Sequence, residues 1–161
     1  MPSGVLTVAV TGDQSERHLV LRGRLDEAAH LVAQVDAWAA RRVILDTGEL
    51  TFINSIGIRE WMHFLAGLTR AGSTLYHERC SEPLVEQMCF IPAVRCGGTV
   101  RSFHAPYLCG GCGAELSMLI DVAQHHDTLR AMKAPPLPCP TCLAPMDLAD
   151  LPERLVAFLR D

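Results

Sequence analysis

The sequence contains no long apolar run, although 49% of its 161 residues are apolar. No uninterrupted apolar stretch approaches the roughly 20 residues that a membrane-spanning helix needs. Residues Met1 to Gly4 carry no basic group ahead of an apolar stretch, so they do not resemble a secretory signal. We therefore expect a cytoplasmic protein with no membrane partner, and a length that suits one ordinary domain or one domain with a small appendage.

Positive charge is also scarce. Lys133 is the only lysine, and the formal net charge is −4. A protein that grips nucleic acid needs lysine and arginine side chains to neutralise phosphates. The composition therefore argues against a nucleic-acid partner.

Familiar catalytic motifs are missing as well. The sequence has no glycine loop of the kind that cradles phosphate, no HExxH motif and no convincing pair of carboxylates. His77, Glu78 and Cys80 lie close in sequence, but the odd spacing of His77 and Cys80 puts them on opposite faces of a strand. We interpret Cys80, Cys89 and Cys96 as small core residues. The sequence thus predicts a protein that is not an enzyme and has no small-molecule substrate.

Apolar patterns of period two and of helical period alternate along residues 6–104. Strands are expected at 6–10, 18–25, 42–46, 73–78 and 99–104, and helices at 26–40, at 55–72 and from 81 onward, with Phe52 following a short turn. Helices between strands favour a sheet with parallel neighbours. The predicted fold class is therefore α/β, a mixed sheet with helices packed on it.

The start of the helix at residue 55 is the most informative local feature. Ile58, Trp61, Met62, Leu65 and Leu68 have the spacing of one helical face. Asn54 and Ser55 stand where an N-cap belongs. A hydroxyl there faces unpaired amides and the positive end of the helix dipole, which suits a phosphate. The simpler interpretation is that Ser55 only caps the helix.

Three segments resemble the STAS domain of bacterial anti-sigma-factor antagonists over about residues 5–103. The segments are Gly23-Arg24-Leu25-Asp26, Val43-Ile44-Leu45-Asp46 and Phe52-Ile53-Asn54-Ser55-Ile56-Gly57-Ile58. The resemblance implies a STAS-like domain at 1–103. It also implies a protein partner, an anti-sigma factor with serine-kinase activity, that binds the Ser55 loop and the following helix. Ser55 takes the place of the phosphorylated serine, beside Asn54 and Gly57.

Two positions depart from that family pattern. Asn54 stands where the family has aspartate, and Ile56 stands where a small residue usually follows the serine. These departures motivate an alternative, a constitutive scaffold that is not phosphorylated and contains structural zinc. In that alternative Ser55 is only an N-cap.

The last third contains two CxxC pairs, Cys109 with Cys112 and Cys139 with Cys142, separated by 26 residues. Four thiolates at such spacing can bind one tetrahedral zinc ion. An iron–sulfur cluster also uses four cysteines and stays open as an alternative. The pattern is similar to zinc ribbons in general, and it predicts a zinc-ribbon-like module at 104–161 with structural Zn2+.

The end of that module is predicted to be a helix. Asp150 to Glu153 has the pattern of a capping box with Pro152 in the first turn. An apolar stripe of Leu151, Leu155, Val156 and Leu159 is expected to pack on the rest of the chain. From His104 onward the chain has four basic and seven acidic residues, 4 − 7 = −3. A nucleic-acid-binding zinc ribbon is therefore the weaker alternative.

Overall fold

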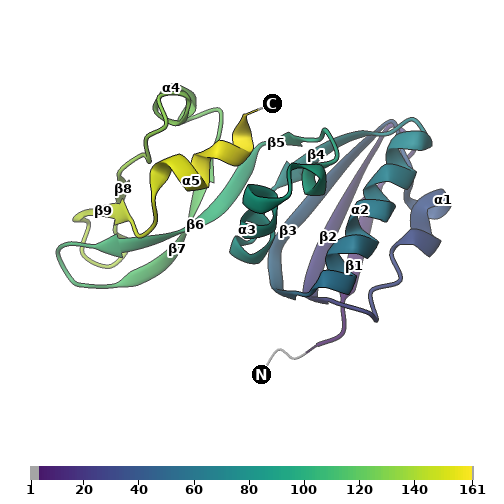
Figure 1. The fold of residues 1–161 in the computed structure, drawn as a ribbon, viewed down its shortest axis with the longest axis horizontal. Coiled ribbons are helices and arrows are strands. Elements are labelled where there is room, and N and C mark those ends of the chain that lie inside the picture. The colour runs from purple at the N-terminus through teal and green to yellow at the C-terminus, as the bar shows by residue number, and fades with distance from the viewer. Residues whose placement is uncertain (1–3, 161) are drawn as a thin grey trace.

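The computed structural model describes residues 4–160 and contains two β-sheets with short helices around them (Figure 1). The first sheet has the order β1-β2-β3-β4-β5 and the second the order β7-β6-β9-β8. The strands are β1 (Thr7–Gly12), β2 (Glu16–Leu25), β3 (Arg42–Ile53), β4 (Thr74–Glu78), β5 (Thr99–Val100), β6 (Ser102–Cys109), β7 (Glu115–Asp121), β8 (Leu137–Pro138) and β9 (Pro145–Leu148). The predicted α/β class is confirmed.

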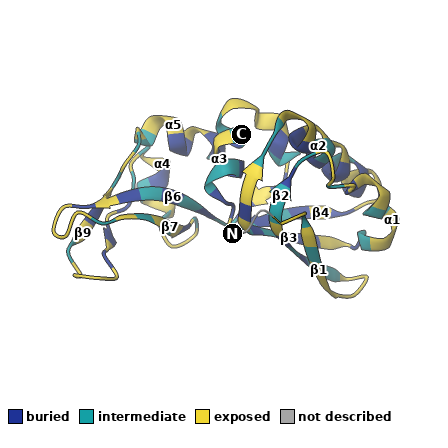
Figure 2. Cartoon of the chain, turned by 90° about the horizontal axis from the view of Figure 1, so that it is seen from below, coloured by how far each residue is buried: buried dark blue, intermediate teal, exposed yellow. Residues whose placement is uncertain are grey.

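Most of the helical structure accompanies the first sheet. The helices are η1 (Val32–Gln34), α1 (Val35–Trp38), α2 (Ser55–Arg70), α3 (Glu82–Phe90), η2 (Pro92–Arg95), α4 (His126–Arg130), α5 (Pro152–Val156) and η3 (Ala157–Leu159). Figures 1 and 2 place α1, α2 and α3 on the same face of the first sheet. None of the helices within residues 4–160 is long and apolar enough to cross a membrane.

The first sheet is mixed. β1 is antiparallel to β2, whereas β2, β3, β4 and β5 are mutually parallel. Alternate residues of β2 point to the helices, and Leu19, Leu21 and Leu25 are fully buried there. The long helix α2 covers them with Trp61 and Phe64, which are also fully buried. Met62, which we expected on this face, is only half-buried.

The turn expected between Asp46 and Phe52 is wrong. β3 runs without a break from Arg42 to Ile53. Parallel pairing with β2 continues to Ile53, and two register shifts in β2, one of them between Val20 and Arg22, accommodate the polar stretch. Pairing on both sides of the first half therefore overrides a local sequence that looks like a turn.

The helix expected over 26–40 is also wrong. Only η1 and the four-residue α1 form there. The Asp26 carboxylate accepts the amide of Ala28 at 3.1 Å and so stabilises a turn. His30 then adopts a positive φ of 47°, which no helix contains. These two local conformations delay the helix to residue 32.

The strand expected over 99–104 is split between the two sheets. β5 ends at Val100, and β6 starts at Ser102. Arg101 is the hinge, because its amide donates to the carbonyl of His77 at 2.7 Å and its carbonyl accepts from Val122 at 2.9 Å. The predicted boundary between 1–103 and 104–161 thus falls inside β6, and the division into domains stays a prediction.

The C-terminal segment packs between the second sheet and η2. Phe158 meets Phe103 edge to face at 5.1 Å between ring centroids, and its carbonyl accepts from the Arg95 guanidinium at 3.1 Å. The capping box is wrong, since Leu151 is the N-cap of α5 and makes no side-chain capping bond. The stripe also differs, because Leu151 is 66% exposed while Phe158 is buried.

The remaining residues, 1–3 and 161, are not described. The expectation that Met1 to Gly4 is no secretory signal lies mostly outside the described residues. Asp161, one of the seven acidic residues counted from His104 onward, also lies outside the described residues.

Candidate functional site

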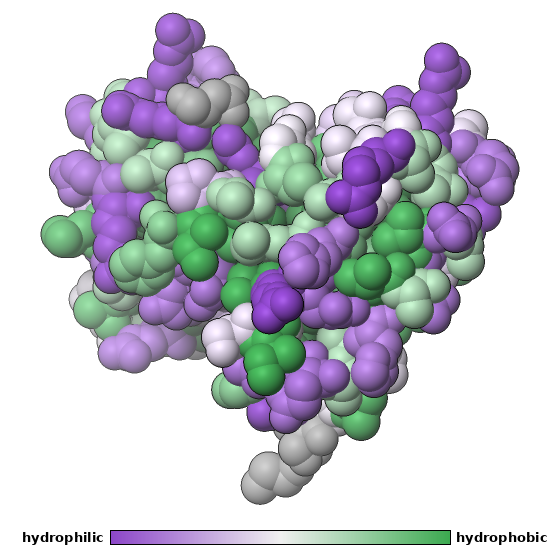
Figure 3. Space-filling view, turned by 45° about the vertical axis from the view of Figure 1, so that its right-hand side comes forward, coloured by the Kyte–Doolittle hydropathy of each residue, from purple (hydrophilic) through white to green (hydrophobic). Residues whose placement is uncertain are grey.

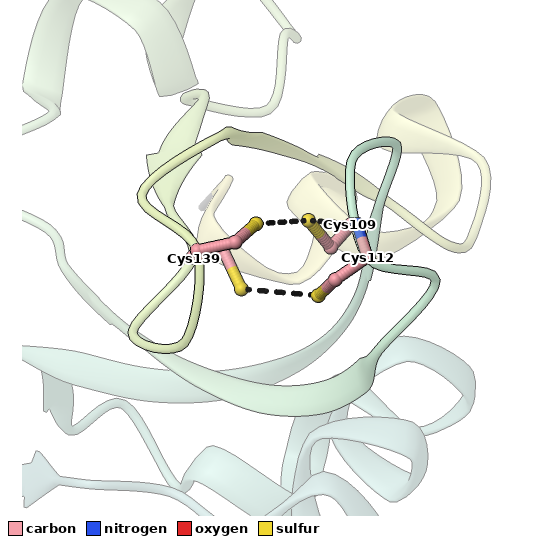
Figure 4. Close-up of side chains that lie close together, drawn as sticks. Cys109, Cys112 and Cys139 are labelled. Atoms are coloured by element: carbon pink, nitrogen blue, oxygen red, sulfur yellow. Dashed lines mark hydrogen bonds between the residues drawn. The ribbon is translucent and has the colours of Figure 1, made fainter.

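The four cysteines of the two CxxC pairs meet at one point. Their sulfur atoms all lie within 4.8 Å of one another. Cys109 Sγ lies 3.4 Å from Cys142 Sγ, and Cys112 Sγ lies 3.7 Å from Cys139 Sγ. Figure 4 shows the two loops facing each other, with both short contacts running from one loop to the other. The cluster can therefore hold a metal ion.

Each CxxC pair sits on a turn of the same construction. The Cys109 amide donates to the carbonyl of Ala114 at 2.9 Å, and the Gly113 amide donates back to Cys109 at 3.0 Å. The second turn repeats both bonds, from Cys139 to Ala144 at 2.8 Å and from Leu143 to Cys139 at 2.9 Å. Each turn connects two antiparallel strands, β6 with β7 and β8 with β9.

Backbone amides of these turns point toward the sulfur atoms. The Cys112 amide donates to Cys109 Sγ at 3.4 Å. This bond, with a smaller contribution from the Gly111 amide, lowers the pKa of the Cys109 thiol to about 6. The amides of Cys142 and Thr141 likewise lower the pKa of Cys139. Thiolates are the form that binds metal, so the turns prepare these two cysteines for binding.

Cys142 behaves differently. The amide of Ala144 lowers its pKa, but the neighbouring thiols raise it, and together they set the pKa to about 11. Crowded thiols compete for protons because several negative charges at one point repel each other. A bound cation relieves that repulsion, which gives the donor set a physical preference for a metal.

The other cysteines stand apart from the cluster. Burial raises the pKa of the Cys80 thiol to about 12, and burial also raises that of Cys89. His77 is fully buried, its Nε2 lies 2.9 Å from the carbonyl of Arg95, and burial lowers its pKa to about 4. His125 is half-buried and His126 is exposed. Among the described residues, these histidines do not join the sulfur cluster.

The second predicted site is the start of α2. The helix begins at Ser55 as expected, but Asn54 is its N-cap, and Asn54 Oδ1 accepts the amide of Gly57 at 2.8 Å. Ser55 is the first helical residue and is exposed. The interpretation of Ser55 as the cap is therefore wrong. The hydroxyl is free of the capping role that the neighbouring amide side chain performs.

The loop before the helix is held from the side of β2. The backbone amide of Asn54 donates to the carbonyl of Leu25 at 3.2 Å. Gly57 lies so close to the same strand that a Cβ atom on it would come within 1.8 Å of the Leu25 carbonyl oxygen. Only glycine fits at that position, so the conformation of the loop depends on Gly57.

Sequence reasoning did not find one carboxylate that lies next to this loop, that of Glu27. Asn54 Nδ2 donates to Glu27 Oε2 at 2.9 Å. Hydrogen bonds from the Glu27 amide and from Asn54 lower the pKa of Glu27. Glu27 comes from the turn after β2, 27 residues earlier, and local patterns carry no signal for such a contact.

Two residues close to Ser55 in the sequence have exposed apolar side chains. Ile56 is 56% exposed and Phe52 is 37% exposed. Arg24 lies over the Phe52 ring at 3.8 Å from its centroid. In the space-filling view, apolar side chains form small groups separated by polar ones (Figure 3).

No protein-family model matches the sequence, and no curated protein matches it. The resemblance to STAS domains rests on the three segments quoted above and stays a prediction.

Proposed function

We propose that this protein is an adaptor of the STAS type. It binds a protein partner through the Ser55 loop, defined as residues 52–57, together with α2. The partner implied by the resemblance is an anti-sigma factor with serine-kinase activity. The supporting observation is the exposed Ser55 at the start of the 16-residue α2, in a loop fixed by Asn54 and Gly57.

Phosphorylation of Ser55 is the switch in this proposal. A phosphate adds roughly 1.5 to 2 negative charges at the helix start. The unpaired amides and the dipole of α2 tolerate that charge. A partner surface packed on Ile56 and Phe52 does not, because it would have to bury a charged group. Binding is then switched without unfolding the domain.

A photo-crosslinking experiment tests the surface and the switch together. A benzophenone amino acid replaces Ile56 in one variant and Thr11, exposed on β1, in a matched control. The expected result is a crosslinked kinase partner from position 56 only. In the position-56 variant, Ser55→Glu abolishes the crosslink and Ser55→Ala retains it. Phosphate from ATP is incorporated only when residue 55 is serine. Equal crosslinking from both positions, or from neither, contradicts the proposed surface.

The constitutive scaffold is the second candidate, and Glu27 favours it. Its carboxylate lies 2.9 Å from Asn54 Nδ2, so a phosphate on Ser55 would meet a negative charge next to the loop. In this candidate the partner binds the same surface permanently. A crosslink from position 56 that survives Ser55→Glu, with no phosphate on Ser55, supports the scaffold over the switch.

We further propose that the four cysteines bind a single structural zinc ion in a zinc-ribbon-like module. Four sulfurs at about 2.3 Å from one tetrahedral centre lie about 3.8 Å apart. The short contacts of 3.4 and 3.7 Å are close to that spacing. Sulfurs on different irons of a cluster are separated by two metal–sulfur bonds and by the cluster core. The observed spacing therefore favours one metal ion over a cluster.

A further inference from the structure

A groove of about 360 Å3 lies where the first sheet, the start of α3 and the second sheet meet. Its lining includes Leu50 from β3, Ser81, Glu82 and Pro83 from the start of α3, and His104 from β6. A second cavity of about 220 Å3 shares Glu82, Pro83 and His104 with it. The groove is distinct from both the sulfur cluster and the Ser55 loop.

Backbone pairing directs two polar side chains into this groove. Cys80 forms a parallel bridge with Phe103, and the His104 amide donates to the Cys80 carbonyl at 2.8 Å. Cys80 and Phe103 are fully buried in the core. Successive residues of an extended chain point to opposite sides, so Ser81 and His104 point together into the groove.

Ser81 is buried and His104 is half-buried, but Ser81 Oγ and His104 Nε2 are both shielded from solvent. Ser81 is 3% exposed, and it is the N-cap of the nine-residue α3 without making a capping bond. Neither Ser81 Oγ nor His104 Nε2 has a partner among residues 4–160. Buried polar groups are nearly always paired, so these two atoms point to a bound molecule.

The surrounding groups define which molecule fits. Pro83 in the first turn of α3 has no amide hydrogen, but the Glu82 amide has no partner inside the helix and adds a donor beside Ser81. Burial, with a smaller effect of Arg79, lowers the pKa of His104, so its ring is neutral and can donate one N–H. The Glu82 carboxylate forms no ion pair within residues 4–160, whereas Arg79 pairs with Asp46 at 3.6 Å. The groove thus offers hydrogen-bond donors together with a neighbouring carboxylate that has no ion-pair partner within residues 4–160.

We propose that the groove binds a zwitterionic α-amino acid with an aliphatic side chain. The ligand carboxylate accepts from Ser81 Oγ, His104 Nε2 and the Glu82 amide. The ligand ammonium donates to Glu82, and the aliphatic side chain packs on Leu50 and Pro83. This binding site goes beyond the adaptor function proposed above and does not depend on it.

Titration of the full chain with L-leucine, followed by the imidazole NMR signals of His104, tests the site. Leucine shifts these signals saturably. Acetate carries only the carboxylate and methylammonium only the ammonium group of the zwitterion. Each is expected to bind at least about tenfold more weakly than leucine, which corresponds to about 1.4 kcal/mol of binding free energy. Ser81→Ala and Glu82→Gln each weaken leucine binding by about tenfold or more.

Ser81→Ala is a clean variant, because the hydroxyl makes no bond inside the described chain and its loss leaves the fold intact. Glu153→Gln removes an exposed carboxylate outside the groove and serves as the control. No saturable shift with leucine means that the groove holds only water and overturns the proposal. A response to acetate equal to that of leucine, or leucine binding unchanged in both groove variants, overturns it as well.

Discussion

At the scale of single residues, the two cysteine turns carry different residues directly after their second cysteine. Gly113 follows Cys112 with a φ of 74°, and Leu143 follows Cys142 with a φ of 63°. Both turns close with the same pair of hydrogen bonds, so both need the left-handed conformation there. Glycine adopts it freely, but a residue with a Cβ atom is destabilised by about 1–2 kcal/mol. Leu143 is also 79% exposed, so packing does not compensate.

Leu143→Gly is therefore expected to stabilise the protein. The relief of strain exceeds the extra entropy of glycine in the unfolded chain, and the net gain is about 0.5–1 kcal/mol. Urea denaturation at fixed metal concentration measures the difference. Gly113→Ala is the mirror-image control and should lose a similar amount. A lower stability of Leu143→Gly would show that the two turns are not equivalent.

The backbone conformation of Leu143 illustrates what a sequence does not reveal. Both CxxC pairs could be recognised from spacing alone, because ligand spacing is local. A leucine gives no signal for a positive φ, and only the matching bonds of the two turns reveal it. Likewise, Ser81 was recognised as the start of a helix, but its unpartnered hydroxyl depends on a bridge between Cys80 and Phe103, 23 residues apart in the chain.

At the scale of elements, the sequence predicts α2 best. Its start at residue 55 and its inward residues Ile58, Trp61, Leu65 and Leu68 are found in the structure. A 16-residue helix with one apolar face gives a strong periodic signal. The segment over 26–40 has helical spacing too, yet its first six residues are not helical, because Asp26 binds the backbone and His30 has a positive φ. The length of β3 was missed because the second half of the strand forms by pairing with β2, which is not local in sequence.

The start of α2 yields a prediction about which residue stabilises it. Asn54→Ala should cost about 1 kcal/mol, because the Gly57 amide loses its acceptor. Ser55→Ala should change stability by less than about 0.5 kcal/mol, since an exposed first-turn residue without a capping role contributes little. Urea denaturation of the two variants checks this, each measured beside the wild-type protein. Equal losses in both variants would mean that Ser55 shares the cap.

Asn54→Asp separates capping from charge. Aspartate keeps the acceptor for Gly57 and is a good cap, but it places a second carboxylate beside Glu27, which now accepts from Asn54 at 2.9 Å. The variant carries the aspartate of the family pattern. Its stability relative to Asn54→Ala reports how strongly Glu27 disfavours negative charge at this loop.

At the scale of the whole molecule, the two sheets share one apolar core, but the sulfur cluster lies at its far end. β6 begins at Ser102, next to the end of the first sheet, and ends at Cys109 in the cluster; Figure 1 shows the strand running between the two ends of the molecule. Near the first sheet, side-chain contacts such as that between Phe103 and Phe158 hold the C-terminal segment against β6. At the other end β8 has only two residues and β9 four. Such short strands contribute little stability on their own, so a metal ion bound by the four cysteines would hold them together.

Removal of the metal should therefore loosen one end of the molecule before the other. Elemental analysis of the purified chain is expected to give one zinc per chain. After chelation, amides of the two cysteine turns and of β8 and β9 should lose hydrogen-exchange protection, while β2, β3 and the buried face of α2 keep theirs. The loss follows from the coupling of metal binding to folding, in which thiolates without a cation repel one another.

Two cysteine variants make that test specific. Cys139→Ser removes a ligand and should reproduce the exchange pattern of the chelated protein without a chelator. Cys89→Ser changes a half-buried thiol outside the cluster and should retain both zinc and protection. Because Phe158 and Arg95 connect the C-terminal segment to the first half, α5 should stay partly protected in the chelated protein. Uniform loss of protection through β2 and α2 would instead show that the metal stabilises the molecule as one cooperative unit.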